Sequence, residues 1–308
     1  MTIAMNNPNT INNDKPSKSP LRQKKRVDWR ERIFHGLFLS CAVIGIVSLA
    51  TIAYFIVKES IPAFQQVGVS GIVFGQDWLP PALYGVFTMI VASVVSTFGA
   101  VLVGVPIGIL TAIFIAEIAP KRLADIIRPA VELLAGIPSV VYGFFGLVII
   151  VPLIQDIFQV PAGNTILAGI IVLGIMILPT VITVSETSIR AVPATYKEGS
   201  LALGASKIFT IFRILLPAAR SGIMTGVILG IARALGETMA IIMVMGNAPA
   251  MPEGILDSAR TLTANIAIEM SYASGIHASA LYATGVVLLV FIMSLNGILL
   301  YLNRETAR

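Results

Sequence analysis

Long apolar runs alternate with short polar segments along most of this chain. Each run has about 20 residues or more, the length that an α-helix needs to cross the hydrocarbon core of a bilayer. The runs occupy residues 33–57, 84–118, 126–154, 164–188, 218–245 and 278–302. The pattern predicts an all-α polytopic membrane protein with six transmembrane helices.

The amino-terminal segment, residues 1–27, has a different composition from the rest of the chain. It is polar and rich in Asn, Ser, Pro and Lys, so it cannot bury enough apolar surface to fold. The apolar run after it exceeds the 7–15 residues of a signal-peptide core. We therefore predict a disordered tail, followed by a transmembrane domain over residues 28–308.

The placement of the basic residues predicts the orientation in the membrane. Charged residues make up 12% of the 308 residues, about half of the share in soluble proteins. Of the 21 Lys and Arg residues, 18 lie in the segments 15–32, 121–128, 190–220 and 303–308. Basic residues accumulate on the cytoplasmic side of membrane proteins, so we expect both termini in the cytoplasm. The net charge of +5 follows this topology and does not indicate nucleic-acid binding.

The sequence contains no set of residues typical of a metal site, a disulfide or a nucleotide site. Cys41 is the single cysteine, and the two histidines, His35 and His277, lie at opposite ends of the membrane region. A phosphate-binding P-loop needs a Gly-Lys pair, and the chain has none. We expect no catalytic residue, no metal and no cofactor bound by this chain.

Two of the apolar runs carry residues that disturb a membrane helix. Pro138 removes a backbone donor within the third run, which predicts a kink or a break that faces the interior of the bundle. In the fifth run, Arg233 and Glu237 are four residues apart, on one face of a regular helix. An arginine near mid-membrane costs about 2.5–3.5 kcal/mol, so it must face protein, water or substrate.

Two interpretations of the charged pair remain open from the residues alone. Arg233 and Glu237 are either a buried ion pair that fixes helix packing or part of an anion-selective pathway. We favour the pathway, because charges inside a membrane usually mark one and a guanidinium fork suits an oxyanion.

The basic segment between the fourth and fifth runs, residues 189–217, carries an ordered motif. Glu198, Gly204, Ile214, Leu216 and Pro217 fall in the order E-x5-G-x9-I-x-L-P. Gly204 predicts a break between two short helices, and Pro217 a new helix start. The motif resembles the EAA loop of ABC importer permeases, on which an ATPase subunit docks, although Gly199-Ser200 replaces the two alanines. The resemblance implies the type I importer permease fold and a coupling loop over residues 189–217.

A closer resemblance, over about residues 30–303, is to the PstC-type permeases of bacterial phosphate importers. It rests on the coupling loop and on three further segments: YGVFTMIVASVVST at 84–97, LLAGIPSVVYGFFGL at 133–147 and ARALGETMA at 232–240. It implies an inner-membrane permease in which Arg233 and Glu237 belong to the phosphate pathway. It also implies a PstA-type permease partner, a PstB-type ATPase dimer that holds ATP and magnesium, and a PstS-type phosphate-binding protein. The binding protein would dock on the external segments 58–84 and 246–277.

Other transport functions share part of this pattern. A PstA-like subunit, or a permease for molybdate, tungstate or sulfate, would have a similar coupling loop. A secondary transporter would need no ATPase, and a purely structural membrane protein would need no arginine inside a span, so the sequence favours these two less.

Overall fold

The computed structural model describes residues 29–306, so the predicted tail over residues 1–27 lies outside the described residues. Contacts divide the described chain into two units, a first that ends at residue 52 and a second that begins at residue 53. In the first unit, residues 33–52 are helical and their side chains are all exposed. A helix whose exposed side chains are apolar on every side is typical of a membrane span that contacts lipid.

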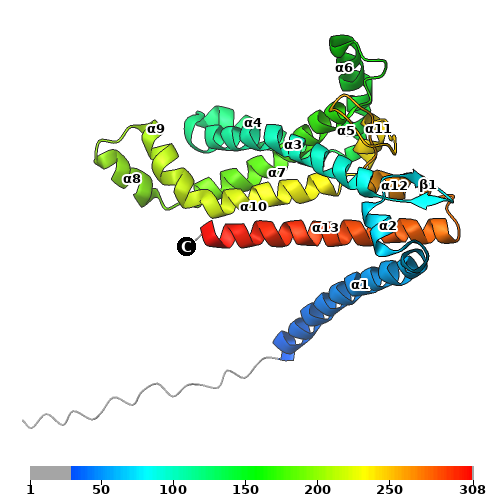
Figure 1. Ribbon diagram of the computed structural model, residues 1–308. Helices are drawn as coiled ribbons and strands as arrows, with labels where there is room; N and C mark the ends of the chain where they lie inside the picture. The colour runs from blue at the N-terminus through cyan, green and yellow to red at the C-terminus, as the bar shows by residue number, and fades with distance from the viewer. Residues whose placement is uncertain (1–28, 307–308) are drawn as a thin grey trace, which may run out of the picture. The chain divides into compact units, whose positions relative to one another are not determined.

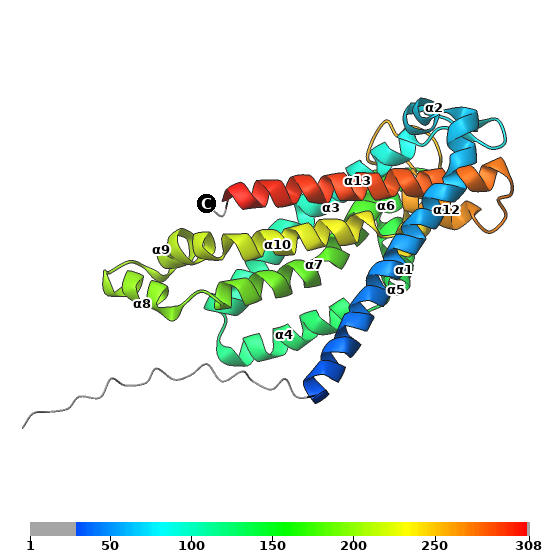
Figure 2. The same ribbon diagram turned by 90° about the horizontal axis from the view of Figure 1, so that it is seen from below.

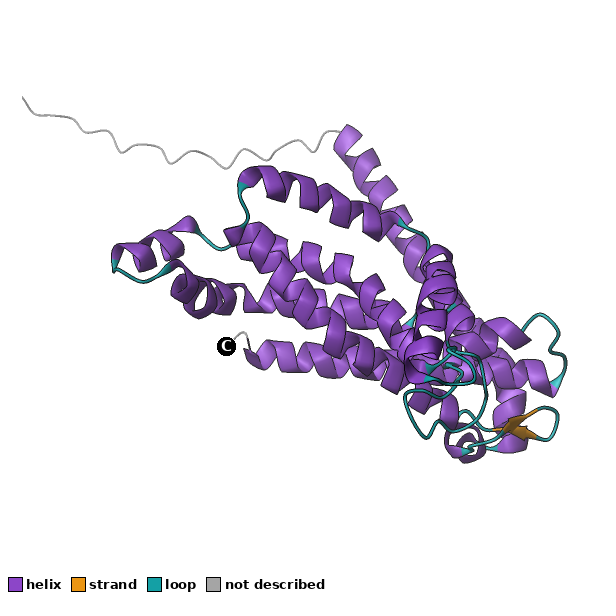
Figure 3. Ribbon diagram, turned by 90° about the horizontal axis from the view of Figure 1, so that it is seen from above, coloured by secondary structure: helices purple, strands orange, loops and turns teal. Residues whose placement is uncertain are grey.

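Most of the described chain is helical (Figures 1 and 3). The helices are α1 (Trp29–Val67), α2 (Val69–Phe74), α3 (Phe87–Ile113), α4 (Lys121–Gly136), α5 (Ser139–Phe145), α6 (Val151–Phe158), α7 (Ile166–Arg190), α8 (Ala194–Ala202), α9 (Lys207–Thr210), α10 (Leu216–Leu235), α11 (Met239–Val244), α12 (Leu262–Glu269) and α13 (Ile276–Thr306). Three π-helical turns, Phe114–Ile118, Gly146–Ile150 and Ile211–Leu215, extend or join them. Two short strands, β1 (Trp78–Leu79) and β2 (Leu83–Tyr84), pair antiparallel.

Within residues 29–306, six helical stretches are long and apolar enough to cross a membrane, which confirms the predicted number. They are Ile33–Val67, Phe87–Ile118, Ser139–Phe158, Ile166–Arg190, Lys207–Leu235 and Ile276–Leu299. The first continues ten residues beyond the expected end at residue 57, through Pro62. Its last turns belong to the second unit, where Ala63 is buried in a cluster with Ile72 and Leu281.

The third stretch begins later than the hydropathy pattern predicted. Residues 126–136 belong to α4, a separate helix with charged residues along one side, and the membrane-long stretch starts only at Ser139. The helix is interrupted at Ile137 and Pro138, the position that the sequence predicted for a break. The hydropathy pattern combined the apolar residues of α4 and the helix that follows into one predicted span. An average along the chain does not distinguish a helix with one apolar face from a helix that is apolar on all sides.

The fifth stretch is displaced toward the amino terminus. It was predicted over residues 218–245, but the continuous helix runs from Lys207 to Leu235 and ends there. Residues 239–244 form the separate short helix α11. The second half of the predicted coupling loop is therefore part of a membrane-length helix.

Helix α7 is the centre of the second unit and packs on both α3 and α10, and Figure 2 shows it between α10 and α4. Of its apolar stretch, 61% is buried, against at most 33% for each other stretch. Glycines allow the close approach: a Cβ at Gly104 would lie 2.8 Å from the Gly174 carbonyl oxygen, and one at Gly108 would lie 2.8 Å from Val181. In a bilayer the lipid is as apolar as the side chains, so helices associate through close van der Waals packing, which small residues allow.

A buried carboxylate joins four segments at the end of the second unit that holds the β-hairpin. Glu269 Oε1 accepts a hydrogen bond from Arg260 Nη1 at 2.6 Å, and Oε2 accepts one from Trp78 Nε1 at 2.9 Å. His277 Nε2 lies 2.8 Å from Oε2. Burial raises the pKa of Glu269, but these three partners outweigh burial and hold the pKa below its usual 4.5. Glu269 thereby fixes α12 against β1 and the start of α13.

We expect Glu269→Gln to lower the free energy of unfolding by about 3 kcal/mol, because it leaves Arg260 buried without its counter-charge. A lower melting temperature of the detergent-solubilised protein measures this effect. Glu253→Gln is the matched control, since Glu253 is exposed. The folded-state pKa of Glu269 is lowered, so its stabilisation is complete above pH 4.5 and is lost as the pH falls through the folded value. Equal melting temperatures for both variants at neutral pH would contradict this role.

Candidate functional site

The first part of the candidate site is a break between α10 and α11. Helix α10 ends at Leu235, and Gly236, Glu237 and Thr238 connect it to α11. Arg233 lies in the last turn of α10, while Glu237 lies beyond the helix end. The prediction that both residues share one helix face is therefore wrong. Glycine at position 236 favours a helix end, and this local preference prevails over the apolar run that continues past it.

The structure gives Arg233 and Glu237 different surroundings. Glu237 Oε1 accepts a hydrogen bond from the Ala240 backbone N–H at 3.1 Å, so its carboxylate caps the start of α11. The Glu237 carbonyl accepts one from Thr263 Oγ1 at 2.8 Å, which ties the break to α12. Arg233 is exposed and takes part in none of the ion pairs formed within residues 29–306.

A second helix break lies beside the first. Helix α4 ends at Gly136 and α5 begins at Ser139, and Tyr142 Oη donates a hydrogen bond across the gap to the Leu134 carbonyl at 2.8 Å. Helix α5 packs directly on α11: a Cβ at Gly143 would lie 2.8 Å from Ala240 Cα. Two interrupted helices thus meet where membrane spans would otherwise be continuous. Such backbone is tolerated at membrane depth only against protein or water.

The Arg233 side chain can bind an anion. The Arg233 guanidinium offers several donors in a planar fork that matches an oxyanion, and no carboxylate within the described residues neutralises it. Its place in the last turn of α10 favours a cation, because carbonyl groups converge at a helix C-terminus. Among the same residues, no group of His, Cys, Asp or Glu side chains is arranged to hold a metal ion.

The second part of the candidate site is the helical hairpin formed by α8 and α9. Gly204 forms the turn with φ of +85°, a conformation that glycine adopts without strain. Ser206 Oγ accepts a hydrogen bond from the Phe209 N–H at 3.2 Å and caps α9. The Ser200 and Thr210 hydroxyls lie 2.9 Å apart and join the two arms. The predicted break at Gly204 is present.

The hairpin exposes an apolar edge. Leu203 at its tip is 91% exposed, and Leu201, Ile208 and Phe209 are also exposed, as is Phe212 in the π-helical turn that follows α9. Glu198 lies on α8 and is exposed as well. Large apolar side chains gathered on one exposed hairpin are typical of a protein-binding surface.

The carboxyl-terminal motif residues lie elsewhere than expected. Ile214, Leu216 and Pro217 are part of the continuous helical stretch from Lys207 to Leu235. Within that stretch Pro217 lies in the first turn of α10, as predicted, but no loop precedes it. The π-helical turn Ile211–Leu215 immediately precedes Pro217. A widened turn of this kind accommodates the proline ring and its missing N–H without ending the helix.

Sequence reasoning assigned no role to Glu117 and Glu186, which both form ion pairs at the end of the unit that holds α8. Glu117 pairs with Lys197 of α8, and Glu186 pairs with Arg128 and Arg190. The one available signal was Glu186 within the last turns of an apolar run, with Arg190 four residues later.

A protein-family model described as "Binding-protein-dependent transport system inner membrane component" matches residues 104–308. This stretch contains both helix breaks and the α8–α9 hairpin. The chain belongs to this family. Members of the family are permease subunits of ABC importers and are not themselves enzymes.

Two relatives match the chain over most of its length. "Probable ABC transporter permease protein YqgH" of Bacillus subtilis (strain 168) is 40% identical over 276 residues, covering 87% of this chain and 89% of the relative. "Phosphate transport system permease protein PstC" of Pasteurella multocida (strain Pm70) is 34% identical over 278 residues, covering 84% of this chain and 87% of the relative.

Solved structures confirm the permease fold. A bacterial ABC transporter that imports the acidic polysaccharide alginate aligns with a TM-score of 0.67 at 15% identity, over 91% of this chain and 98% of that one. An inward-facing MetNI methionine ABC transporter aligns with a TM-score of 0.55 at 21% identity, over 73% and 95%. At these identities the likeness extends to the fold alone. It supports the type I importer architecture that the sequence predicted.

Proposed function

We propose that this chain is the PstC-type permease subunit of an ATP-driven importer, and that it passes inorganic phosphate into the cytoplasm. The observation that carries the proposal is Arg233, an exposed cation at a helix break in a permease about one-third identical to phosphate permeases. Relatives named PstC that match 84–90% of this chain favour this subunit over a PstA-type one.

Arg233 supplies what a phosphate ion loses when it leaves water. Phosphate carries one to two negative charges near neutral pH, and stripping its water in a low-dielectric cavity is costly without a cation. A guanidinium provides charge and paired hydrogen-bond donors together. In this proposal Glu237 shapes the pathway by capping α11 beside Arg233.

The α8–α9 hairpin receives the energy of ATP hydrolysis from a partner. The chain has no P-loop of its own, so ATP and magnesium bind to a PstB-type ATPase dimer. The exposed apolar edge of the hairpin fits a groove on that ATPase, with Glu198 beside it. A PstA-type permease completes the channel, and a PstS-type binding protein delivers phosphate to the external segments.

The proposed orientation places the α8–α9 hairpin and both termini in the cytoplasm of a bacterial cell. The β1–β2 hairpin then lies on the external side of the inner membrane. Cysteines at Gln76 and Glu253, in a Cys41→Ala background, should react with an impermeant thiol reagent added to intact cells. A cysteine at Lys207 should react only after the membrane is permeabilised. All three side chains are exposed, so burial does not limit the reaction. Labelling of position 207 in intact cells would overturn the orientation.

Uptake measurements test the substrate. A strain that lacks its own phosphate importers should accumulate radiolabelled phosphate when it expresses this chain with the ATPase, the permease partner and the binding protein. Unlabelled phosphate should compete, whereas molybdate, tungstate and sulfate in equal excess should not. Competition by one of these three oxyanions, without competition by phosphate, would assign the permease to that anion instead.

A further inference from the structure

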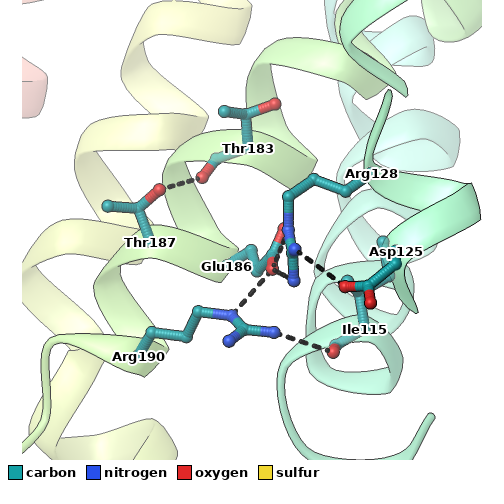
Figure 4. Close-up of polar contacts among 7 residues, drawn as sticks. All are labelled: Ile115, Asp125, Arg128, Thr183, Glu186, Thr187 and Arg190. Atoms are coloured by element: carbon teal, nitrogen blue, oxygen red, sulfur yellow. Dashed lines mark hydrogen bonds and ion pairs between the residues drawn. The ribbon is translucent and has the colours of Figure 1, made fainter. Parts of the chain in front are cut away.

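A second buried carboxylate, Glu186, lies at the end of the second unit that holds the α8–α9 hairpin, and it joins this end to α4. Glu186, in the last turns of α7, has only 7% of its side chain exposed. Its Oε1 accepts hydrogen bonds from Arg128 Nε at 3.0 Å and from Arg190 Nε at 2.8 Å, and Arg128 Nη2 lies 2.9 Å away (Figure 4). One oxygen atom therefore holds an arginine of α4 and the last residue of α7 together.

Further contacts connect this joint to the hairpin. Arg190 Nη2 donates a hydrogen bond to the Ile115 carbonyl at 3.3 Å, in the π-helical turn that follows α3 (Figure 4). Glu117, in the same turn, pairs with Lys197 of α8. Only the short segment 191–193 separates Arg190 from α8. The start of the hairpin is thus held at two points, through Lys197 and through Arg190.

Helix α4 extends from this joint to the paired helix breaks. Arg128 lies near its middle, and its last residue, Gly136, adjoins the break at Ile137 and Pro138. The part of α4 between Arg128 and Gly136 is continuous helix about 12 Å long, and it includes Pro129. Beyond the break, α5 packs on α11, the helix that Glu237 caps. A continuous series of packed elements therefore runs from α8 to the neighbourhood of Arg233.

Stability alone is a weak reason for this joint. A buried ion pair repays its desolvation only in part, and replacing it with apolar residues is often neutral. Asp125 offers an internal comparison, because it faces the same Arg128 at 3.8 Å but is 55% exposed. Among the carboxylates of residues 29–306, Glu186 is the one that pairs with both Arg128 and Arg190.

We propose that Glu186 is a positioning residue for transport: it clamps α4 to the end of α7, so that a displacement of the hairpin by the ATPase moves α4 and opens the helix breaks beside Arg233. The proposal rests on the proposed function. It concerns a permanent joint that transmits motion, not a contact that opens and closes during the cycle.

The test compares Glu186→Gln with the matched control Asp125→Asn in the complete transporter, reconstituted with its ATPase, permease partner and binding protein. Phosphate transported per ATP hydrolysed is measured per purified complex. Glu186→Gln should lower this ratio about tenfold while ATP hydrolysis continues, and Asp125→Asn should stay within about twofold. A purely structural role would lower the yield of complex and leave the ratio unchanged, and that result would overturn the proposal.

A covalent replacement of the joint provides the second test. Cysteines at positions 128 and 186, in a Cys41→Ala background, should lower the ratio as Glu186→Gln does. A cross-linker with two methanethiosulfonate groups, which forms a disulfide with each cysteine and releases methanesulfinate, should restore the ratio, and reduction of these disulfides should lower it again. A cross-linked complex that transports no better than the reduced one would refute a permanent joint.

Failure of the proposed function would give a different result, because the parental complex would then not transport phosphate. The ratio of substrate transported to ATP hydrolysed would in that case be measured with the oxyanion that the complex does transport.

Discussion

Replacing Arg233 with glutamine is expected to abolish phosphate uptake while the transporter still assembles. The guanidinium is the exposed cation at the paired breaks, and glutamine keeps a polar side chain but removes the charge and the paired donors. Losing two charge-assisted hydrogen bonds corresponds to about a hundredfold or more in transport rate. Uptake of radiolabelled phosphate into cells measures the effect, and co-purification of the ATPase shows that the complex is intact.

Arg233→Lys is the conservative control. Lysine keeps the charge but not the fork, so uptake should fall between that of the parent and that of the glutamine variant. Exchanging the charges, as Arg233→Glu with Glu237→Arg, should not restore uptake. The two residues form no ion pair, and the exchange would also remove the carboxylate that caps α11. Parental uptake in the glutamine variant would remove Arg233 from the pathway.

The second large effect is expected at the turn of the hairpin. Gly204→Val should uncouple transport, because a β-branched residue is strained at a φ of +85°. No neighbouring atom lies within 4 Å of a Cβ built at this position, so backbone conformation and not crowding is the cause. We expect uptake to fall by about tenfold or more as the hairpin loses its docking geometry. The amount of ATPase that co-purifies should fall with it.

Two variants separate this strain from a general sensitivity of the hairpin. Gly204→Asn should retain most of the activity, since asparagine adopts the left-handed conformation more readily than other side chains. Gly199→Ala should also be tolerated, because Gly199 lies within α8 and has nothing within 4 Å of a Cβ. If valine and asparagine at position 204 behave alike, backbone strain at the turn is not the cause.

The sequence by itself determined the features that depend on neighbours along the chain. Six apolar runs of sufficient length predicted six membrane-long helices, and the structure has six within the described residues. Pro138 predicted the break before α5, and Gly204 the turn of the hairpin. Each of these follows from a local property: the length of an apolar run, a missing N–H, or a φ that glycine adopts freely. The roles of Arg233, Glu237 and the hairpin residues remain predictions.

Only the tertiary structure decided where two of the spans begin and end, and which charges meet. Hydropathy placed the fifth span over residues 218–245, but α10 ends at Leu235, so Glu237 caps α11 and does not pair with Arg233. The contact between Arg128 and Glu186 joins residues 58 positions apart, and that between Trp78 and Glu269 joins residues 191 apart. A hydropathy average contains no term for such contacts. A buried charge selects its partner from the helices that pack around it, and that packing exists only in the folded chain.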